Sequence, residues 1–90
     1  MINKSEANKT IHKVQMQWHY DKLTKHGWIA DTPESIGFVR SYNYHHPKSD
    51  IKITVTTGCN GDYWSAKNDK KEIDGGWWST LEPFVVKINS

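Results

Sequence analysis

The sequence has only one cysteine, Cys59, so no disulfide can form within the chain. Small extracellular domains usually depend on several disulfides, and a lone cysteine is more typical of an intracellular protein. The first ten residues are polar and unlike a signal peptide, and no stretch approaches the ~20 apolar residues of a membrane span. We therefore expect a soluble, cytoplasmic protein that does not enter a membrane.

An excess of charge of one sign is also lacking, because twelve basic residues face ten acidic ones and the net charge is only +2. This balance falls far short of the strongly basic composition that nucleic-acid-binding domains often have. The small positive excess lies in residues 1–30, which hold five lysines against two acidic residues. The bias is compatible with nucleic-acid binding and does not require it.

Motifs of metal binding and catalysis are missing as well. His12, His19 and His26 are spaced by seven, which on a helix places neighbours about 10.5 Å apart, too far to share one ion. No CxxC or HxxxH pair occurs, and the glycines do not form a phosphate-binding loop. We expect no metal, no cofactor and no catalytic residue, and we place these histidines on the polar flank of a helix.

Aromatic residues, by contrast, are abundant, with five Trp, four Tyr and two Phe among 90 residues. Since Leu, Ile and Val are few, these large rings are expected to form much of the core. The length suffices for a single domain, which we place at residues 10–90 after a flexible N-terminus of residues 1–9.

Residues 14–20, VQMQWHY, alternate between apolar and polar residues as a β-strand does. Their surroundings favour a helix, because no Gly or Pro interrupts the chain before Gly27, which follows a basic turn. We favour a helix over about residues 10–26 and keep the strand open. As a helix, the segment places Trp18 away from Met16, where Trp18 needs cover from the C-terminal third or from a partner.

Later segments have the alternation and residue types of strands, namely residues 36–44, 51–57 and 63–66. The charged residues 67–76 are expected to form a loop. Residues 77–88 allow a short helix or a strand, and Pro83 followed by FVVKI favours a final strand. The predicted fold class is α+β, with an N-terminal helix packed on a three- or four-stranded antiparallel sheet and a short C-terminal helix or strand.

Aromatic and basic side chains alternate along the first of these strands. Phe38, Arg40, Tyr42 and Tyr44 share one face, where rings could stack on bases and basic groups could hold phosphate. The alternative is that the three aromatic residues belong to the core. Under the first interpretation the nucleic-acid-binding residues are Lys13, Lys22, Lys25, Arg40, Tyr42, Tyr44, His45 and Lys48.

Tryptophan provides a second set of candidates. Trp77 and Trp78 are adjacent, so on a strand one of them faces outward, and an exposed tryptophan is a frequent contact in protein interfaces. With Trp18 they form the predicted set of partner-binding residues.

From Leu23 to Val55 the chain resembles the HicA family of small toxins. The similarity rests on LTKHGW at the predicted helix end, on the His46-Pro47 pair and on the strand residues ITV. It implies a fold like the double-stranded-RNA-binding domain, RNA as the substrate and an antitoxin protein as the partner. The catalytic histidine of the family falls at Ser41, so the resemblance implies the fold and an RNA-facing geometry without RNase activity.

We therefore predict a small, non-enzymatic regulatory protein, of the kind encoded by phages and mobile elements, that binds a protein partner as an inhibitor or adaptor. The alternative is a nucleic-acid-binding module with RNA or DNA as the partner. A degenerate RNase with His45 or His46 as the base is a third interpretation. A homodimer is compatible with either form of binding.

Overall fold

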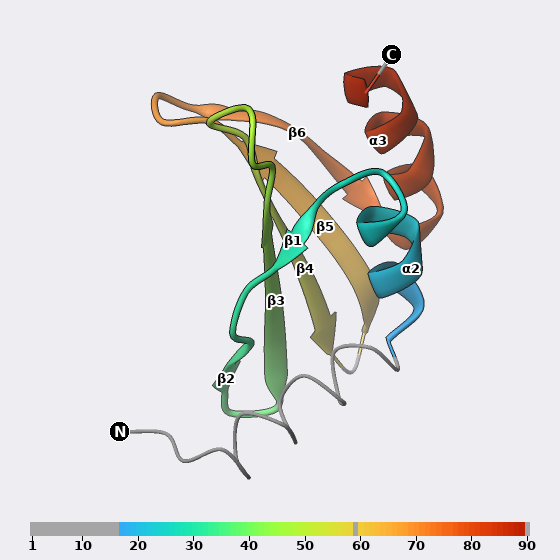
Figure 1. The fold of residues 1–90 in the computed structure, drawn as a ribbon. Helices are drawn as coiled ribbons and strands as arrows, with labels where there is room; N and C mark the ends of the chain where they lie inside the picture. Colours follow the sequence, from blue (N-terminus) through green and yellow to red (C-terminus); the bar gives the residue numbers. More distant parts are fainter. Residues whose placement is uncertain (1–16, 59, 90) are drawn as a thin grey trace, which may run out of the picture.

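The computed structural model describes residues 17–58 and 60–89, and these residues have an α+β fold. One helix precedes a six-stranded antiparallel sheet, and a 3-10 turn and a second helix follow it (Figure 1). The predicted fold class is confirmed, with more strands than expected. The elements are α2 (Trp18–Thr24), β1 (Ile29–Ala30), β2 (Glu34–Ile36), β3 (Val39–His45), β4 (Lys52–Gly58), β5 (Gly61–Lys67), β6 (Glu72–Trp77), η1 (Trp78–Thr80) and α3 (Leu81–Asn89).

The strands follow the order β1-β3-β4-β5-β6, and β2 pairs with the other end of β3. Both helices lie on one side of the sheet in Figure 1. No helix among residues 17–58 and 60–89 covers the opposite side, which we call the open face. Neither described helix is long and apolar enough to cross a membrane.

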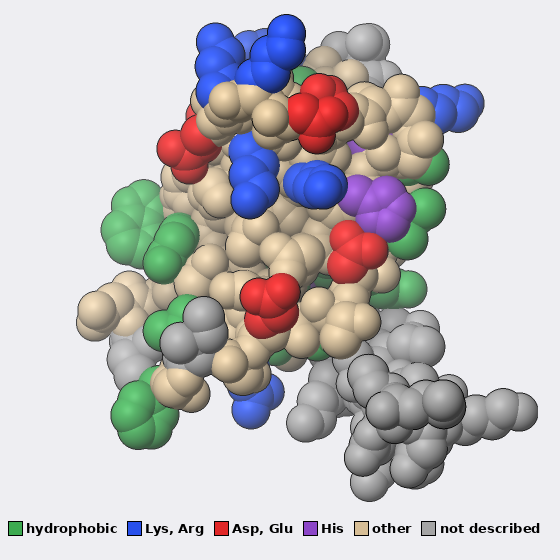
Figure 2. Space-filling view, turned by 90° about the vertical axis from the view of Figure 1, so that its left-hand side faces the viewer, with side chains coloured by type: hydrophobic (Ala, Val, Ile, Leu, Met, Phe, Trp, Pro, Cys, Tyr) green, Lys and Arg blue, Asp and Glu red, His purple; other side chains and the backbone are tan. Residues whose placement is uncertain are grey.

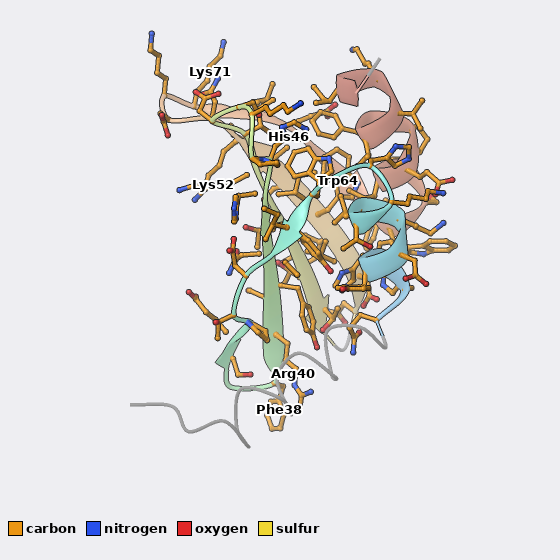
Figure 3. All side chains as sticks on the ribbon, in the orientation of Figure 1. Phe38, Arg40, His46, Lys52, Trp64 and Lys71 are labelled. Carbon is orange, nitrogen blue, oxygen red and sulfur yellow. The ribbon has the colours of Figure 1, made fainter. Side chains whose placement is uncertain are left out.

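The core lies between the sheet and the helices, and strand alternation selects its residues. Tyr42 of β3 stands opposite Val55 of β4, which in turn stands opposite Trp64 of β5. In Figure 3 Trp64 points toward the helices and Lys52 points away from them. Five of the eleven core residues are aromatic, which confirms the expected aromatic core. The full set is Leu23, Trp28, Tyr42, Tyr44, Ile53, Val55, Trp64, Ala66, Leu81, Phe84 and Val85.

The segment that allowed a helix or a strand is helical over Trp18–Thr24. His19 and Leu23 are buried, and their spacing of four residues places both on the side facing the core. The chain turns away at Gly27, whose φ of +89° is a conformation that favours glycine. The earlier part of the predicted helix, residues 10–16, lies outside the described residues, as do residues 1–9.

The loop predicted at residues 67–76 is wrong in its second half. Residues 72–76 belong to β6, because pairing with β5 at the sheet edge leaves their charged side chains in water. Of the two forms predicted for the C-terminal segment, the helix is confirmed as α3, and the strand that the sequence favoured is not formed. Pro83 lies in the first turn of this helix, where its missing N–H removes no helical hydrogen bond. The α3 residues that pack at the core follow helical spacing, namely Leu81, Phe84, Val85 and Ile88.

The open face carries the other half of the side chains of each strand. One row across it is basic, since His45 stands opposite Lys52, which stands opposite Lys67. Tyr63 and Trp77 stand opposite each other in another row. Figure 2 shows basic side chains beside a histidine across the middle of this face and apolar ones along its margins. Ser41 and Thr56 continue the row of Tyr63 and Trp77, and the row between it and the basic row is polar, with Asn43, Thr54 and Ser65.

The free edge of β6 has features that discourage pairing with another strand. The N–H of Gly75 donates to the Oδ1 atom of Asp74 at 2.8 Å, so a carboxylate occupies this edge. A shift in register beside Ala66 and Lys67 also makes the pairing of β5 with β6 irregular. Bulges and charges at an edge oppose sheet-to-sheet association. The homodimer stays a prediction, and this edge does not favour it.

Candidate functional site

Trp18 and Trp78 meet where the start of α2 lies beside η1. Their rings pack edge to face, with centroids 6.1 Å apart at an interplanar angle of 71°. The indole N–H of Trp18 donates to the Oδ2 atom of Asp62, at the start of β5, over 2.7 Å. Trp18 is half-buried as a result, while the side chain of Trp78 is 56% exposed. The cover expected for a helical Trp18 thus comes from the C-terminal third.

Trp77 ends β6 and reaches the open face of the sheet. It stands opposite Tyr63, and the two side chains are 61% and 50% exposed. Its ring lies over Gly61, because a Cβ atom built on that glycine would be 3.5 Å from Cζ3 of Trp77. Gly61 also lies beside Trp18 and Trp78 on the helix side. We call Trp18, Tyr63, Trp77 and Trp78 together the tryptophan surface, and Gly61 joins its two halves.

A cleft of about 470 Å³ opens on the helix side of the tryptophan surface, lined by Trp18, Lys22, Gly61, Asp62 and Trp78. Its walls are two indole rings, and its charged groups are one carboxylate and one ammonium. The ammonium of Lys22 lies 3.4 Å from the Oε2 atom of Glu82 in α3, and Lys25 contacts the same oxygen at 3.2 Å. Hydrogen bonds from Lys25 and then Lys22 lower the pKa of the Glu82 carboxyl.

Trp64 supports the tryptophan surface from the core. Its ring is 2% exposed and packs against Phe84 of α3, with centroids 4.8 Å apart. Its indole N–H is shared between the carbonyl oxygen of Trp77 at 3.1 Å and the hydroxyl of Thr80 at 2.9 Å. The Thr80 hydroxyl donates to the same carbonyl at 2.8 Å. These bonds fix the turn from β6 into η1 and so hold Trp77 and Trp78 in place.

His19 is completely buried beside Trp18, so its predicted place on a polar flank is wrong. It follows Trp18 on α2 and shares the core side with Leu23. Its Nδ1 atom lies 2.5 Å from the hydroxyl of Tyr44, and its Nε2 atom has no hydrogen-bond partner among the described residues. Burial lowers the pKa of His19 to about 4, against the opposing effect of the Asp62 carboxylate. Burial also raises the pKa of Tyr44.

The predicted nucleic-acid-binding residues do not form one surface. Tyr42 and Tyr44 are buried beneath the helices, so the prediction that they stack on bases is wrong and their alternative place in the core is confirmed. Phe38, assigned to the core with them, is instead 91% exposed in the turn between β2 and β3. Figure 3 shows it beside Arg40, at the opposite end of β3 from His45.

The remaining candidates for nucleic-acid binding are dispersed. Lys22 and Lys25 lie on the helix side of the sheet and both contact Glu82. His45 lies on the open face, with its Nδ1 atom 2.9 Å from the Oδ1 atom of Asp31. Lys48 is exposed in the turn between β3 and β4, and Lys13 lies outside the described residues.

Three residues of this site were not among the sequence candidates. Tyr63 had a usable signal, because an inward Trp64 and Ala66 on a strand require an outward Tyr63. Asp62 and Gly61 had none, since both read equally well as turn residues. Their role depends on contacts with α2 and β6, which are remote in sequence.

No three potential metal ligands come together in the part of the chain that the structure describes. Comparisons with protein-family models, curated proteins and solved structures found no match. The resemblance of residues 23–55 to HicA toxins stays a prediction. Function must therefore be inferred from the geometry of the tryptophan surface.

Proposed function

We propose that the protein is a small regulatory protein that binds a protein partner through the tryptophan surface and acts as an inhibitor or adaptor without catalysing a reaction. The observation that carries this proposal is the contiguity of Trp18, Trp77, Trp78 and Tyr63 at one edge of the sheet. Single exposed aromatic residues are ordinary, whereas a contiguous group is typical of an interaction site. Tryptophan and tyrosine are also enriched among the side chains that dominate binding energy in interfaces.

The way this surface is held also supports the proposal. Trp18 is fixed by Asp62, and the backbone between Trp77 and Trp78 is fixed by Trp64 and Thr80. Ordering flexible side chains costs free energy on association, and a surface that is already ordered avoids much of that cost. Large rings held by the fold are therefore suited to tight binding of a partner.

Replacing Trp77 and Trp78 together by alanine is expected to abolish capture of the partner. Immobilised wild-type and variant proteins would be exposed to a lysate of the source cells at low salt and at about 0.5 M salt, where surface charges are screened. Wild type should retain one protein under both conditions. The captured protein should bind the double variant at least ~100-fold more weakly than it binds wild type, because the dominant contacts are lost.

Val86→Ser is the matched control, because Val86 is 49% exposed on α3 and lies outside the tryptophan surface. This variant should capture the same protein as wild type. Equal capture by the Trp77→Ala/Trp78→Ala variant, or capture that disappears at the higher salt, would contradict the proposal.

A second candidate function is favoured by the open face. The basic row of His45, Lys52 and Lys67 shares this face with the rings of Tyr63 and Trp77, an arrangement that suits single-stranded nucleic acid. If this face binds single-stranded RNA, the Lys52→Gln/Lys67→Gln variant loses two phosphate contacts. The slope of log K against the logarithm of the salt concentration should then become shallower by about 1.4. A titration that detects no RNA or DNA binding at low salt would eliminate this candidate.

A further inference from the structure

The geometry points to an arginine side chain of the protein partner as the ligand of the cleft lined by Trp18 and Trp78, an inference that rests on the proposed function. The cleft volume of about 470 Å³ can take one long side chain. Its two indole rings meet edge to face, so they are not stacked face to face on each other, and both line the cleft. A planar guanidinium stacks well on the face of an indole ring.

The carboxylate of Asp62 supplies the matching charge. Its Oδ2 atom accepts the indole N–H of Trp18 at 2.7 Å, and an indole N–H can only donate. No described residue donates a second hydrogen bond to this carboxylate, which retains acceptor capacity on both oxygens. Asp62 is half-buried, and its strand position is fixed by pairing with Thr57. Hydrogen bonds between a guanidinium and a carboxylate are short and strong, and often bidentate.

Lys22 also lines the cleft, but its ammonium contacts Glu82 and not Asp62. Its ammonium lies 3.4 Å from the carboxylate of Glu82, which is shared with Lys25, and it makes no ion pair with Asp62. The negative charge of Asp62 is therefore not neutralised by a described side chain. A cationic group at this position would gain a direct contact with the Asp62 carboxylate, whereas a phosphate group would meet a charge of the same sign.

The fork of the guanidinium distinguishes arginine from lysine here. An ammonium is strongly hydrated and lacks a flat face, so it gains less from lying between an indole ring and a carboxylate. An apolar side chain would fill the cleft but would leave the charge of Asp62 desolvated with only the indole N–H of Trp18 as a donor, which is costly. The cleft is therefore expected to rank arginine above lysine and leucine.

The test is a titration of the full chain followed by NMR signals of its indole N–H groups. The probes are N-acetyl-arginine amide, the corresponding lysine and leucine amides, and guanosine monophosphate. The arginine amide should shift the signals of Trp18 and Trp78 with a dissociation constant in the millimolar range, while Trp28 and Trp64 stay unchanged. The lysine and leucine amides should bind at least several-fold more weakly.

Asp62→Asn is the decisive variant, because its remaining carbonyl oxygen can still accept the hydrogen bond of Trp18. We expect it to weaken binding of the arginine amide at least ~10-fold, since it loses the charge-assisted contact. Lys22→Gln alters the same cleft without removing the carboxylate and should bind at least as tightly as wild type. Dispersed indole signals in both variants would show that they fold.

Two results would overturn the inference: no shift with the arginine amide, or equal binding of the arginine amide by wild type and Asp62→Asn. Shifts caused by guanosine monophosphate alone would also overturn it and assign the cleft to a nucleotide. The partner-capture experiment distinguishes failure of the arginine inference from failure of the proposed function. If only the cleft inference is wrong, Asp62→Asn retains the partner that Trp77→Ala/Trp78→Ala loses.

Discussion

Lowering the pH from 7 to 5 is expected to remove about 2 kcal/mol from the free energy of unfolding through His19 alone. Burial lowers the pKa of this residue from 6.5 to about 4. Between these values the unfolded chain takes up a proton that the folded protein does not, so stability is fully present above pH 6.5 and is lost as the pH falls toward 4. Urea unfolding at several pH values, followed by circular dichroism, measures this loss.

The control removes both members of the buried pair. The His19→Leu/Tyr44→Phe variant removes both the imidazole and the hydroxyl, so no hydrogen-bonding group is left without its partner. The new side chains are apolar and similar in size to those they replace. This variant should lose about 2 kcal/mol less than wild type between pH 7 and pH 5. An equal loss in both proteins would show that His19 is not kept neutral by its surroundings.

Trp64→Ala is expected to lower the free energy of unfolding by about 3–5 kcal/mol, a large part of the stability of a 90-residue domain. The substitution empties the space between the sheet and Phe84 and deletes the hydrogen bonds to Trp77 and Thr80. Denaturant unfolding measures the loss. If the variant does not fold, Trp64→Phe keeps most of the packing and isolates the loss of the indole N–H.

Trp64→Phe should be less stable than wild type by about 1 kcal/mol beyond the lost packing, since it loses the hydrogen bonds of the indole N–H to Trp77 and Thr80. It should also shift the NMR signals of Trp77 and Trp78. Trp28→Phe is the control for the NMR signals, because both tryptophans are 2% exposed in the same core and Trp28 does not contact the β6–η1 turn through these bonds. Unchanged signals of Trp77 and Trp78 in Trp64→Phe would mean that Trp64 does not hold this turn.

The parts of the fold that the sequence predicts are those with a strong local pattern. Alternation identified β3, β4 and β5, and the glycine after a basic turn identified the end of α2. The errors concern β6 and α3, where local signals mislead. The strand of β6 is recognisable only from its pairing with β5, and Pro83 argues against a helix until it is seen to lie in the first turn.

The candidate site was predictable in its residue type and not in its construction. Trp77 and Trp78 could be selected because adjacent residues on a strand face opposite sides, and Trp18 because a helix places it away from Met16. Their contiguity depends on α2 lying beside η1. The alternation that identified β3 did not show which face of the strand is buried. In the structure the face of Tyr42 and Tyr44 is the buried one, so these residues are not on the surface. Only tertiary packing decides which face is buried.

The indole N–H signals of the five tryptophans give the most direct test of the central claim, that the tryptophan surface is the partner-binding site. Trp28 and Trp64 are buried in the core and serve as internal references, while Trp18, Trp77 and Trp78 lie on the surface in question. When the captured partner is added to labelled protein, the signals of Trp18, Trp77 and Trp78 should shift or broaden and those of the references should not. Unchanged signals from Trp77 and Trp78 at saturating partner would contradict the proposed function.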